Sequence, residues 1–105
     1  MAKEMALDSA AIDNGTITPE RGAQQTVSFT DTSAQASAFK TDIITCYSTQ
    51  DVWIDFGSNP TAVADDGNSV FQPLGFMRVY RVKRGDKLAA IRNSNDGTLY
   101  INGGA

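Results

Sequence analysis

Short segments of alternating hydrophobic and polar residues, separated by turn residues, are the main pattern of this chain. Val27 and Phe29 alternate with polar residues over 26–30, and Leu99 and Ile101 alternate in the same way. Alternation over four to eight residues predicts a half-buried β-strand. The strands that we expect along the chain cover 26–30, 41–48, 52–56, 76–82, 87–92 and 98–102.

Turn residues predict how these strands connect. Residues 48–51 are expected to form a turn, so 41–56 is predicted to be a hairpin. Residues 93–97 are predicted to form a second hairpin loop, in which Gly97 supplies a position that tolerates positive φ. The remaining loops, turns and ends are expected at 31–38, 57–60, 65–68 and 83–86, with a frayed end over 103–105.

Breakers every 8 to 12 residues or so, without a long helical period, indicate an all-β fold. We predict an antiparallel β-sandwich or a jelly-roll-like small barrel over 26–105. Residues 1–25 are poor in large apolar side chains and are expected to form an extended N-terminal arm that becomes ordered on a partner. Leu7 and Ile12 are the candidate contact residues of this arm.

The period of two also assigns faces. The residues expected to point into the core include Val52, Ile54, Phe56, Leu99 and Ile101. Trp53 and Tyr100 are then expected on outer faces, while Tyr80 belongs to a strand with apolar residues on both faces. We interpret these three aromatic residues as a candidate contact surface, since Trp and Tyr are frequent at interface hot spots. The alternative is that a long loop, such as 57–75, covers them.

Composition limits the chemistry. The 105 residues contain no His and one Cys, Cys46, which excludes an imidazole base, a His-ligated metal and an intramolecular disulfide. Asp65 and Asp66 lie in a polar turn, and Asp51 and Asp55 flank one strand. No catalytic residue, metal site or cofactor is therefore predicted. The Asn- and Asp-rich segments 65–68 and 93–97 are interpreted as ordinary turns rather than calcium loops.

Charge is unevenly spread along the chain. Residues 1–66 carry ten acidic and three basic residues, net −7, and 67–105 carry two acidic and six basic residues, net +4. The candidate electrostatic contact residues are Arg78, Arg81, Lys83, Arg84 and Lys87. This asymmetry suits contacts between copies or with a charged partner. The alternative is that the two halves mix in space. Nucleic acid is not expected as a partner, because the whole chain is acidic.

Two further absences concern location. No apolar run approaches the roughly 20 residues of a membrane span, and no apolar signal-peptide core follows Met1. We expect synthesis in the cytoplasm, no membrane contact and a free thiol at Cys46.

Several motifs resemble those of small virion proteins of tailed bacteriophages. The resemblance covers about 41–102 and includes an F-G-x-N-P-T-A segment, an R-V-x-x-G-D-K-L-A segment and a G-T-L-x-I segment. They are found here at 56–62, 81–89 and 97–101, and the Pro- and Gly-containing segment 71–75 lies between the first two. The resemblance implies a capsid-associated protein of the decoration, or cement, type, and it brings no catalytic residue.

We therefore expect a non-enzymatic structural protein that binds and stabilises a capsid shell on the virion surface. Its expected partners are the major capsid protein and further copies of itself, with a trimer favoured. The alternative is a head or tail fibre accessory that binds carbohydrate or a host surface, with Trp53 stacking on a sugar.

Overall fold

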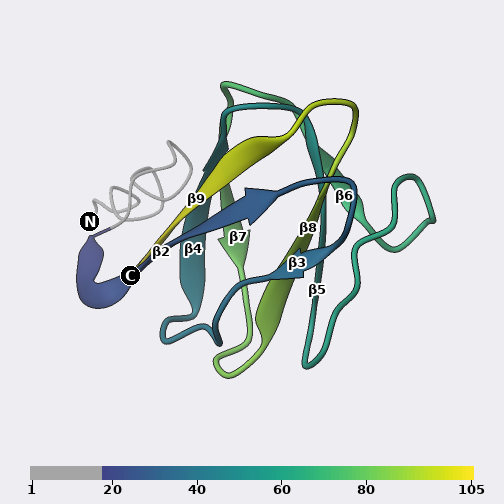
Figure 1. Cartoon of the computed structure of the whole chain (residues 1–105). Helices are drawn as coiled ribbons and strands as arrows, with labels where there is room; N and C mark the ends of the chain where they lie inside the picture. Colours follow the sequence, from purple (N-terminus) through teal and green to yellow (C-terminus); the bar gives the residue numbers. More distant parts are fainter. Residues whose placement is uncertain (1–17) are drawn as a thin grey trace.

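The computed structural model describes residues 18–105, which form eight β-strands (Figure 1). No helix occurs in this part of the chain. The strands are β2 (Pro19–Phe29), β3 (Ala34–Gln35), β4 (Ile43–Ser48), β5 (Val52–Gly57), β6 (Val70–Gln72), β7 (Met77–Arg81), β8 (Lys87–Arg92) and β9 (Gly97–Gly104).

The strands form two four-stranded antiparallel sheets, so the predicted all-β sandwich is confirmed. The first sheet has the order β2-β9-β4-β7 and the second has the order β3-β8-β5-β6. Among residues 18–105, no strand pairing joins β2 to β3 or β6 to β7, so these two sheets are not closed into a barrel. The alternative prediction of a small barrel is therefore wrong, because closure needs hydrogen bonding around the whole circumference.

Strand pairing is nested along the chain. β2 pairs with β9, β3 with β8, β4 with β7 and β5 with β6. Each strand from the acidic half is therefore hydrogen-bonded to a strand from the basic half, and the two halves mix in space. Of the two interpretations of the charge asymmetry, the structure supports mixing along the strands.

The predicted hairpins are wrong, although their strands exist. β4 and β5 lie in different sheets, and so do β8 and β9. Residues 49–51 and 93–96 therefore carry the chain from one sheet to the other. A short polar segment marks where a strand ends, but it does not determine whether the next strand pairs with it or crosses the core.

The core lies between the inner faces of the two sheets. Phe29, Ile54, Leu88 and Leu99 are fully buried there, and the residues predicted to point inward in β5 and β9 do so. Phe56 packs against the core from a partly buried position. Two short edge strands, β3 and β6, were not predicted, since two or three residues give no measurable alternation.

The C-terminal residues are part of a central strand, so the expected frayed end is wrong. Thr18 and Ala105 exchange backbone hydrogen bonds of 2.8 and 3.1 Å. Gly103 is buried, and a Cβ there would lie 2.7 Å from Thr41 Oγ1 and 2.8 Å from Ala23 Cβ. The glycine is needed for this close packing of β9. β2 begins at Pro19, so residues 19–25 of the expected arm form part of the sheet.

Gly97 has a similar reason for being a glycine. Its φ is not among the positive values, so the expected left-handed turn position is wrong. A Cβ at Gly97 would instead lie 2.7 Å from Phe29 Cζ and 2.9 Å from Thr49 Oγ1. The close approach of β2 and β9 at the end of the sandwich therefore leaves no room for a side chain.

The connections gather at two ends of the sandwich. The terminal end holds Thr18, Ala105 and the connections 36–42 and 82–86, and Figure 1 shows the C-terminus beside the start of β2. The far end holds the connections 30–33, 49–51, 73–76 and 93–96. The longest connection, 58–69, links β5 to β6.

Candidate protein–protein interface

The structure separates the aromatic residues that we expected to form one contact surface. Trp53 lies on the outer face of the second sheet, and Tyr100 lies on the outer face of the first sheet. Tyr80 packs against the core from β7. These three residues therefore face three different regions, although Trp53 and Tyr100 are on outer faces, as predicted.

Trp53 is half-buried and its polar group is already used. Its ring contacts Phe71 with an edge-on geometry at a centroid distance of 5.1 Å. Its indole N–H donates to Asn93 Oδ1 at 3.0 Å. Both contacts hold the ring against its own sheet, as a structural role requires.

A loop covers part of the same outer face. Ala62 is buried and its backbone N–H donates to Ser33 Oγ at 2.9 Å, next to β3. The Gln35 side chain donates to Pro60 O at 2.8 Å. The chain thus leaves β5, crosses β8 to reach β3, and returns to β6. These contacts place 58–69 beside β3, whereas Trp53 is contacted by Phe71 of β6.

Tyr80 belongs to a polar network inside the sandwich. Its hydroxyl donates to Gln72 Oε1 at 3.1 Å, and Gln72 Nε2 donates to Cys46 O at 2.8 Å and to Phe76 O at 3.1 Å. Burial raises the pKa of Tyr80 above its ordinary value. Gln72 is fully buried, so this network joins the two sheets on the side where β6 and β7 are the edges. No sequence signal singled out Gln72.

Exposed apolar side chains gather on the first sheet near the side where β6 and β7 are the edge strands. Tyr100 and Met77 flank Tyr47 in register on the outer face, and the Tyr47 and Tyr100 rings lie 6.5 Å apart. Phe76 and Leu74 lie in the connection that leads into Met77, and the Gly75 backbone N–H of this connection donates to Ser48 O, next to Tyr47. We call these five residues the apolar corner. They are 37% to 62% exposed, with Phe76 the most exposed.

Sequence reasoning missed most of this corner. Only Tyr100 was among the predicted contact residues. Tyr47 follows from the same alternation that buries Ile44 and Cys46 in β4. Met77 lies in 76–82, where apolar residues on both faces leave the outer face undetermined by the pattern.

The predicted basic contact residues lie mainly at the terminal end. Arg81 ends β7, Lys83 and Arg84 lie in the following turn, and Lys87 begins β8. Arg84 Nε lies 2.9 Å from Asp42 Oδ1, in an exposed ion pair. Arg78 lies midway along β7, and its Nη1 donates to Phe71 O at 3.3 Å. Four of the five basic residues are thus brought together.

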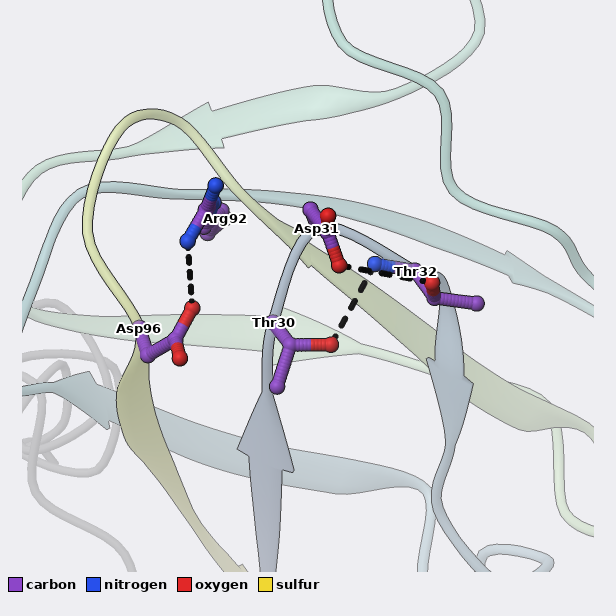
Figure 2. A network of polar contacts seen from close by, with 5 residues as sticks. All are labelled: Thr30, Asp31, Thr32, Arg92 and Asp96. Atoms are coloured by element: carbon purple, nitrogen blue, oxygen red, sulfur yellow. Dashed lines mark hydrogen bonds and ion pairs between the residues drawn. The ribbon is translucent and has the colours of Figure 1, made fainter.

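The far end is acidic by comparison. Asp31, Asp51 and Asp96 lie in its connections. Arg92 Nη1 donates to Asp96 Oδ1 at 2.8 Å. Figure 2 shows this pair, with Asp31 on the neighbouring connection. Asp42 and Asp86 also lie at the terminal end, but basic residues outnumber acidic ones there, whereas the far-end connections hold acidic residues and no basic ones.

The titratable groups of residues 18–105 do not form a cluster that could hold a metal ion. No group of three or more His, Cys, Asp or Glu residues lies together in this part of the chain. Backbone N–H groups of Ser69 and Asn68 donate to Asp66 and lower its pKa, as in a capped turn. Burial raises the pKa of the Cys46 thiol to about 12, which makes it a poor nucleophile.

A half-open cavity of about 170 Å³ lies between β2 and the connection that follows β3. Its lining includes Gln24, Gln25 and Lys40. Gln25 is occupied by hydrogen bonds to the backbone of Ser37, and Lys40 Nζ donates to Gly22 O. This cavity is smaller than the roughly 300 Å³ that small-molecule sites usually need.

Leu7 and Ile12, the contact residues predicted in the arm, lie outside the described residues. No helix among the described residues has the length and hydrophobicity for a membrane span. No family model, curated protein or solved structure matches the chain.

Proposed function

We propose that this chain is a non-enzymatic structural protein of a tailed-bacteriophage virion, which decorates and stabilises the capsid through contacts with the major capsid protein. The observation that carries the proposal is the apolar corner. Small soluble monomers rarely expose a contiguous group of large apolar side chains unless it meets a partner. A role in an assembly accounts for it without any catalytic group.

The strand order supports the same proposal. We infer that the sandwich is a jelly roll, because nested pairing of eight strands is what results when one long antiparallel ribbon is rolled into two facing sheets. Viral capsid domains use this fold, and so do lectins and other unrelated proteins. The fold therefore adds support by analogy, and the surface residues have to identify the role.

The basic terminal end is the proposed contact with the capsid. Arg81, Lys83 and Lys87 are solvent-accessible and lie away from the apolar corner's Tyr100 and Leu74. A surface of this kind fits an acidic protein surface and gives binding that weakens with salt. We propose residues 1–17 as a second contact with the shell.

The test is co-sedimentation with empty heads purified from the phage that encodes the chain. Lys83→Glu combined with Lys87→Glu is expected to reduce head binding at least tenfold. A control with Ser94→Glu and Asn95→Glu adds negative charge at the far end and is expected to bind normally. Deletion of 1–17, which leaves β2 intact, is expected to weaken binding. Absence of the chain from purified virions overturns the proposal.

The carbohydrate-binding alternative receives less support. A sugar stacking on Trp53 would need a free aromatic face and commonly a free indole N–H, whereas this indole is held by Phe71 and Asn93. A change in Trp53 fluorescence on adding glycans would favour the alternative, and an unchanged spectrum would disfavour it.

A further inference from the structure

The first sheet has an open edge at β7. The Val82 backbone N–H donates to Asp42 O at 2.8 Å, which makes these two residues a hydrogen-bonded pair at the end of the ladder between β4 and β7. Hydrogen-bonded pairs alternate along an antiparallel ladder, so Tyr80 and Arg78 also direct their backbone groups toward β4. Among residues 18–105, no strand pairs with the other side of β7. The backbone groups that face outward there are those of Met77, Val79 and Arg81.

The other three edge strands are shorter or are tied to the rest of the chain. β3 and β6 have two and three residues, and Arg78 Nη1 donates to Phe71 O at the edge of β6. β2 is tied to the connection after β3, because Gln25 exchanges hydrogen bonds with the Ser37 backbone. β7 has five residues in unbroken register with β4, without the bulge or proline that often protects an edge. It is therefore the edge best suited to accept a further strand.

The side chains along this edge change from apolar to basic. Met77 and Val79 lie on the outer face, and Met77 belongs to the apolar corner. Arg81 lies on the same face at the opposite end of β7, and Lys83 follows it at the terminal end. Residues 70–85 contain four basic residues and no acidic one. An acidic side chain beside Arg81 and apolar side chains beside Val79 and Met77 would complement this edge.

We propose that the open edge of β7 binds an extended, partly acidic segment of a partner protein, which adds to the first sheet as an antiparallel strand. Outward backbone groups at every second residue fit an extended chain, whose own N–H and C=O groups have the same spacing. Antiparallel pairs are also slightly more stable than parallel pairs. From its N-terminal end, the segment then carries an acidic residue opposite Arg81 and apolar residues opposite Val79 and Met77.

The added strand connects the basic terminal end with the apolar corner. Its acidic residue lies beside Arg81, and its second apolar residue lies beside Met77. Asp51 borders the corner, where its Oδ1 accepts a hydrogen bond from the Leu74 backbone N–H at 2.9 Å, so an acidic residue is disfavoured at that end. The assignment of the segment to the major capsid protein rests on the proposed function, whereas the binding of an acidic strand does not.

The test adds a synthetic peptide to the full chain labelled with nitrogen-15. The peptide acetyl-Thr-Glu-Thr-Val-Thr-Val-Thr-amide places its Glu opposite Arg81 and its two Val residues opposite Val79 and Met77. The amide resonances of these three residues are expected to shift saturably, with a dissociation constant below about 1 mM. The same peptide with Lys in place of Glu should bind at least tenfold more weakly. No shift at about 1 mM peptide, or shifts confined to other strands, overturns the proposal.

N-methylation separates backbone pairing from side-chain contact. The first Val of the peptide donates its N–H to Val79 O, so a methyl group on this nitrogen should weaken binding at least tenfold. The matched control carries the methyl group on the Thr between the two Val residues, whose N–H points away from β7, and it should bind normally. Equal binding of the two methylated peptides overturns strand addition.

Arg81→Glu tests the acidic position. The variant should bind the Glu peptide at least tenfold more weakly, and the Lys peptide more tightly, than the wild-type chain does. Arg21→Glu is the matched control, because it makes the same charge change on an exposed residue of β2, the opposite edge strand of the first sheet. Near-ultraviolet circular dichroism checks that each variant is folded. If both variants lose the Glu peptide equally, general attraction between charges explains the binding and the proposal is wrong.

Three outcomes separate this inference from its rivals. Head binding by a chain that does not bind the peptide contradicts strand addition and keeps the capsid role. Peptide binding by a chain that is absent from virions supports strand addition and contradicts the capsid role. If the peptide binds only after deletion of 1–17, residues of this chain itself occupy the edge and the proposal is wrong.

Discussion

The two open sides of the sandwich are closed by different means. On the side of β2 and β3, the Gln25 side chain exchanges hydrogen bonds of 3.1 and 2.9 Å with the backbone of Ser37. On the side of β6 and β7, the buried Gln72 reaches across the core to Cys46 O, and Tyr80 donates to it. The first contact is near solvent and the second is inside the protein.

The outer surfaces beside these two sides also differ in the polarity of their exposed side chains. Near β2 and β3 the exposed side chains are small or polar, such as Ser28 and Gln35. Near β6 and β7 they include Phe76 and Met77. An edge that is polar outside and tied to its own chain has little to gain from a partner. The comparison therefore identifies the β6 and β7 side as the one to examine for association.

The largest effect is expected from Gln72→Leu. The substitution leaves the Tyr80 hydroxyl and the carbonyl groups of Cys46 and Phe76 without their side-chain partner in a buried position. We expect a loss of about 2–4 kcal/mol in the free energy of unfolding. Urea titration followed by Trp53 fluorescence measures it. The matched control is Gln25→Leu on the other side, for which about 1 kcal/mol is expected. Equal losses would contradict the difference between the two sides.

A somewhat smaller effect is expected from Gly103→Ala, which tests the packing on the β2 side. The new Cβ would lie 2.7 Å from Thr41 Oγ1 and 2.8 Å from Ala23 Cβ. Forcing these atoms apart should cost about 1–3 kcal/mol. Gly57→Ala serves as the control, since its nearest contact would be Pro60 Cβ at 4.0 Å. A thermal midpoint for Gly103→Ala equal to that of Gly57→Ala would show that β2 can move away freely.

Sequence patterns predicted the strands on both sides much better than their partners. Val27, Phe29, Leu99 and Ile101 lie inside as expected, because alternation follows from the pleat of a single strand. Pairing depends on where a connection takes the chain. The sequence of residues 49–51 is compatible both with a hairpin turn and with a connection that crosses the core. This is why the expected hairpin was wrong while its two strands were correct.

The candidate interface was predictable only in part for a related reason. Tyr100 could be placed on an outer face from its own strand. Grouping it with Tyr47 and Met77 requires the order β9-β4-β7, which no single strand determines. Trp53 was grouped with Tyr100 because both point outward, yet the two strands belong to different sheets. Knowing that a side chain points outward does not tell on which of two surfaces it lies.

Cys46 provides a smaller effect that reports on the interior next to Gln72. Burial raises the pKa of the thiol in the folded chain to about 12, from an ordinary value of 9.0. The unfolded chain therefore loses the thiol proton first as the pH rises. Stability from this group is fully present below pH 9 and decreases between about 9 and 12. We expect a loss of about 1 kcal/mol at pH 10.

Urea titrations at pH 8 and pH 10 measure this loss, and Cys46→Ala provides the comparison. The variant should be less stable at pH 8, because a buried side chain has been truncated, but its stability should change less between the two pH values. An equal change in both proteins would show that Tyr80 or another group causes the alkaline loss. Faster alkylation of Cys46 in Gln72→Leu would add that the sheets open more often without the buried amide.

The smallest effect is expected from Asp96→Asn at the far end. Its partner Arg92 is linked to the β2 and β3 side, because the Arg92 backbone N–H donates to Thr30 O. The Arg92 and Asp96 ion pair is short but exposed (Figure 2). Exposed pairs usually contribute less than about 1 kcal/mol, so we expect a loss below about 0.5 kcal/mol that shrinks further in high salt. A double-mutant cycle with Arg92→Gln isolates the pair. A coupling energy above about 1 kcal/mol would mean that exposed polar contacts stabilise the β2 and β3 side as strongly as buried contacts stabilise the β6 and β7 side. The two sides would then differ only in the polarity of their outer surfaces.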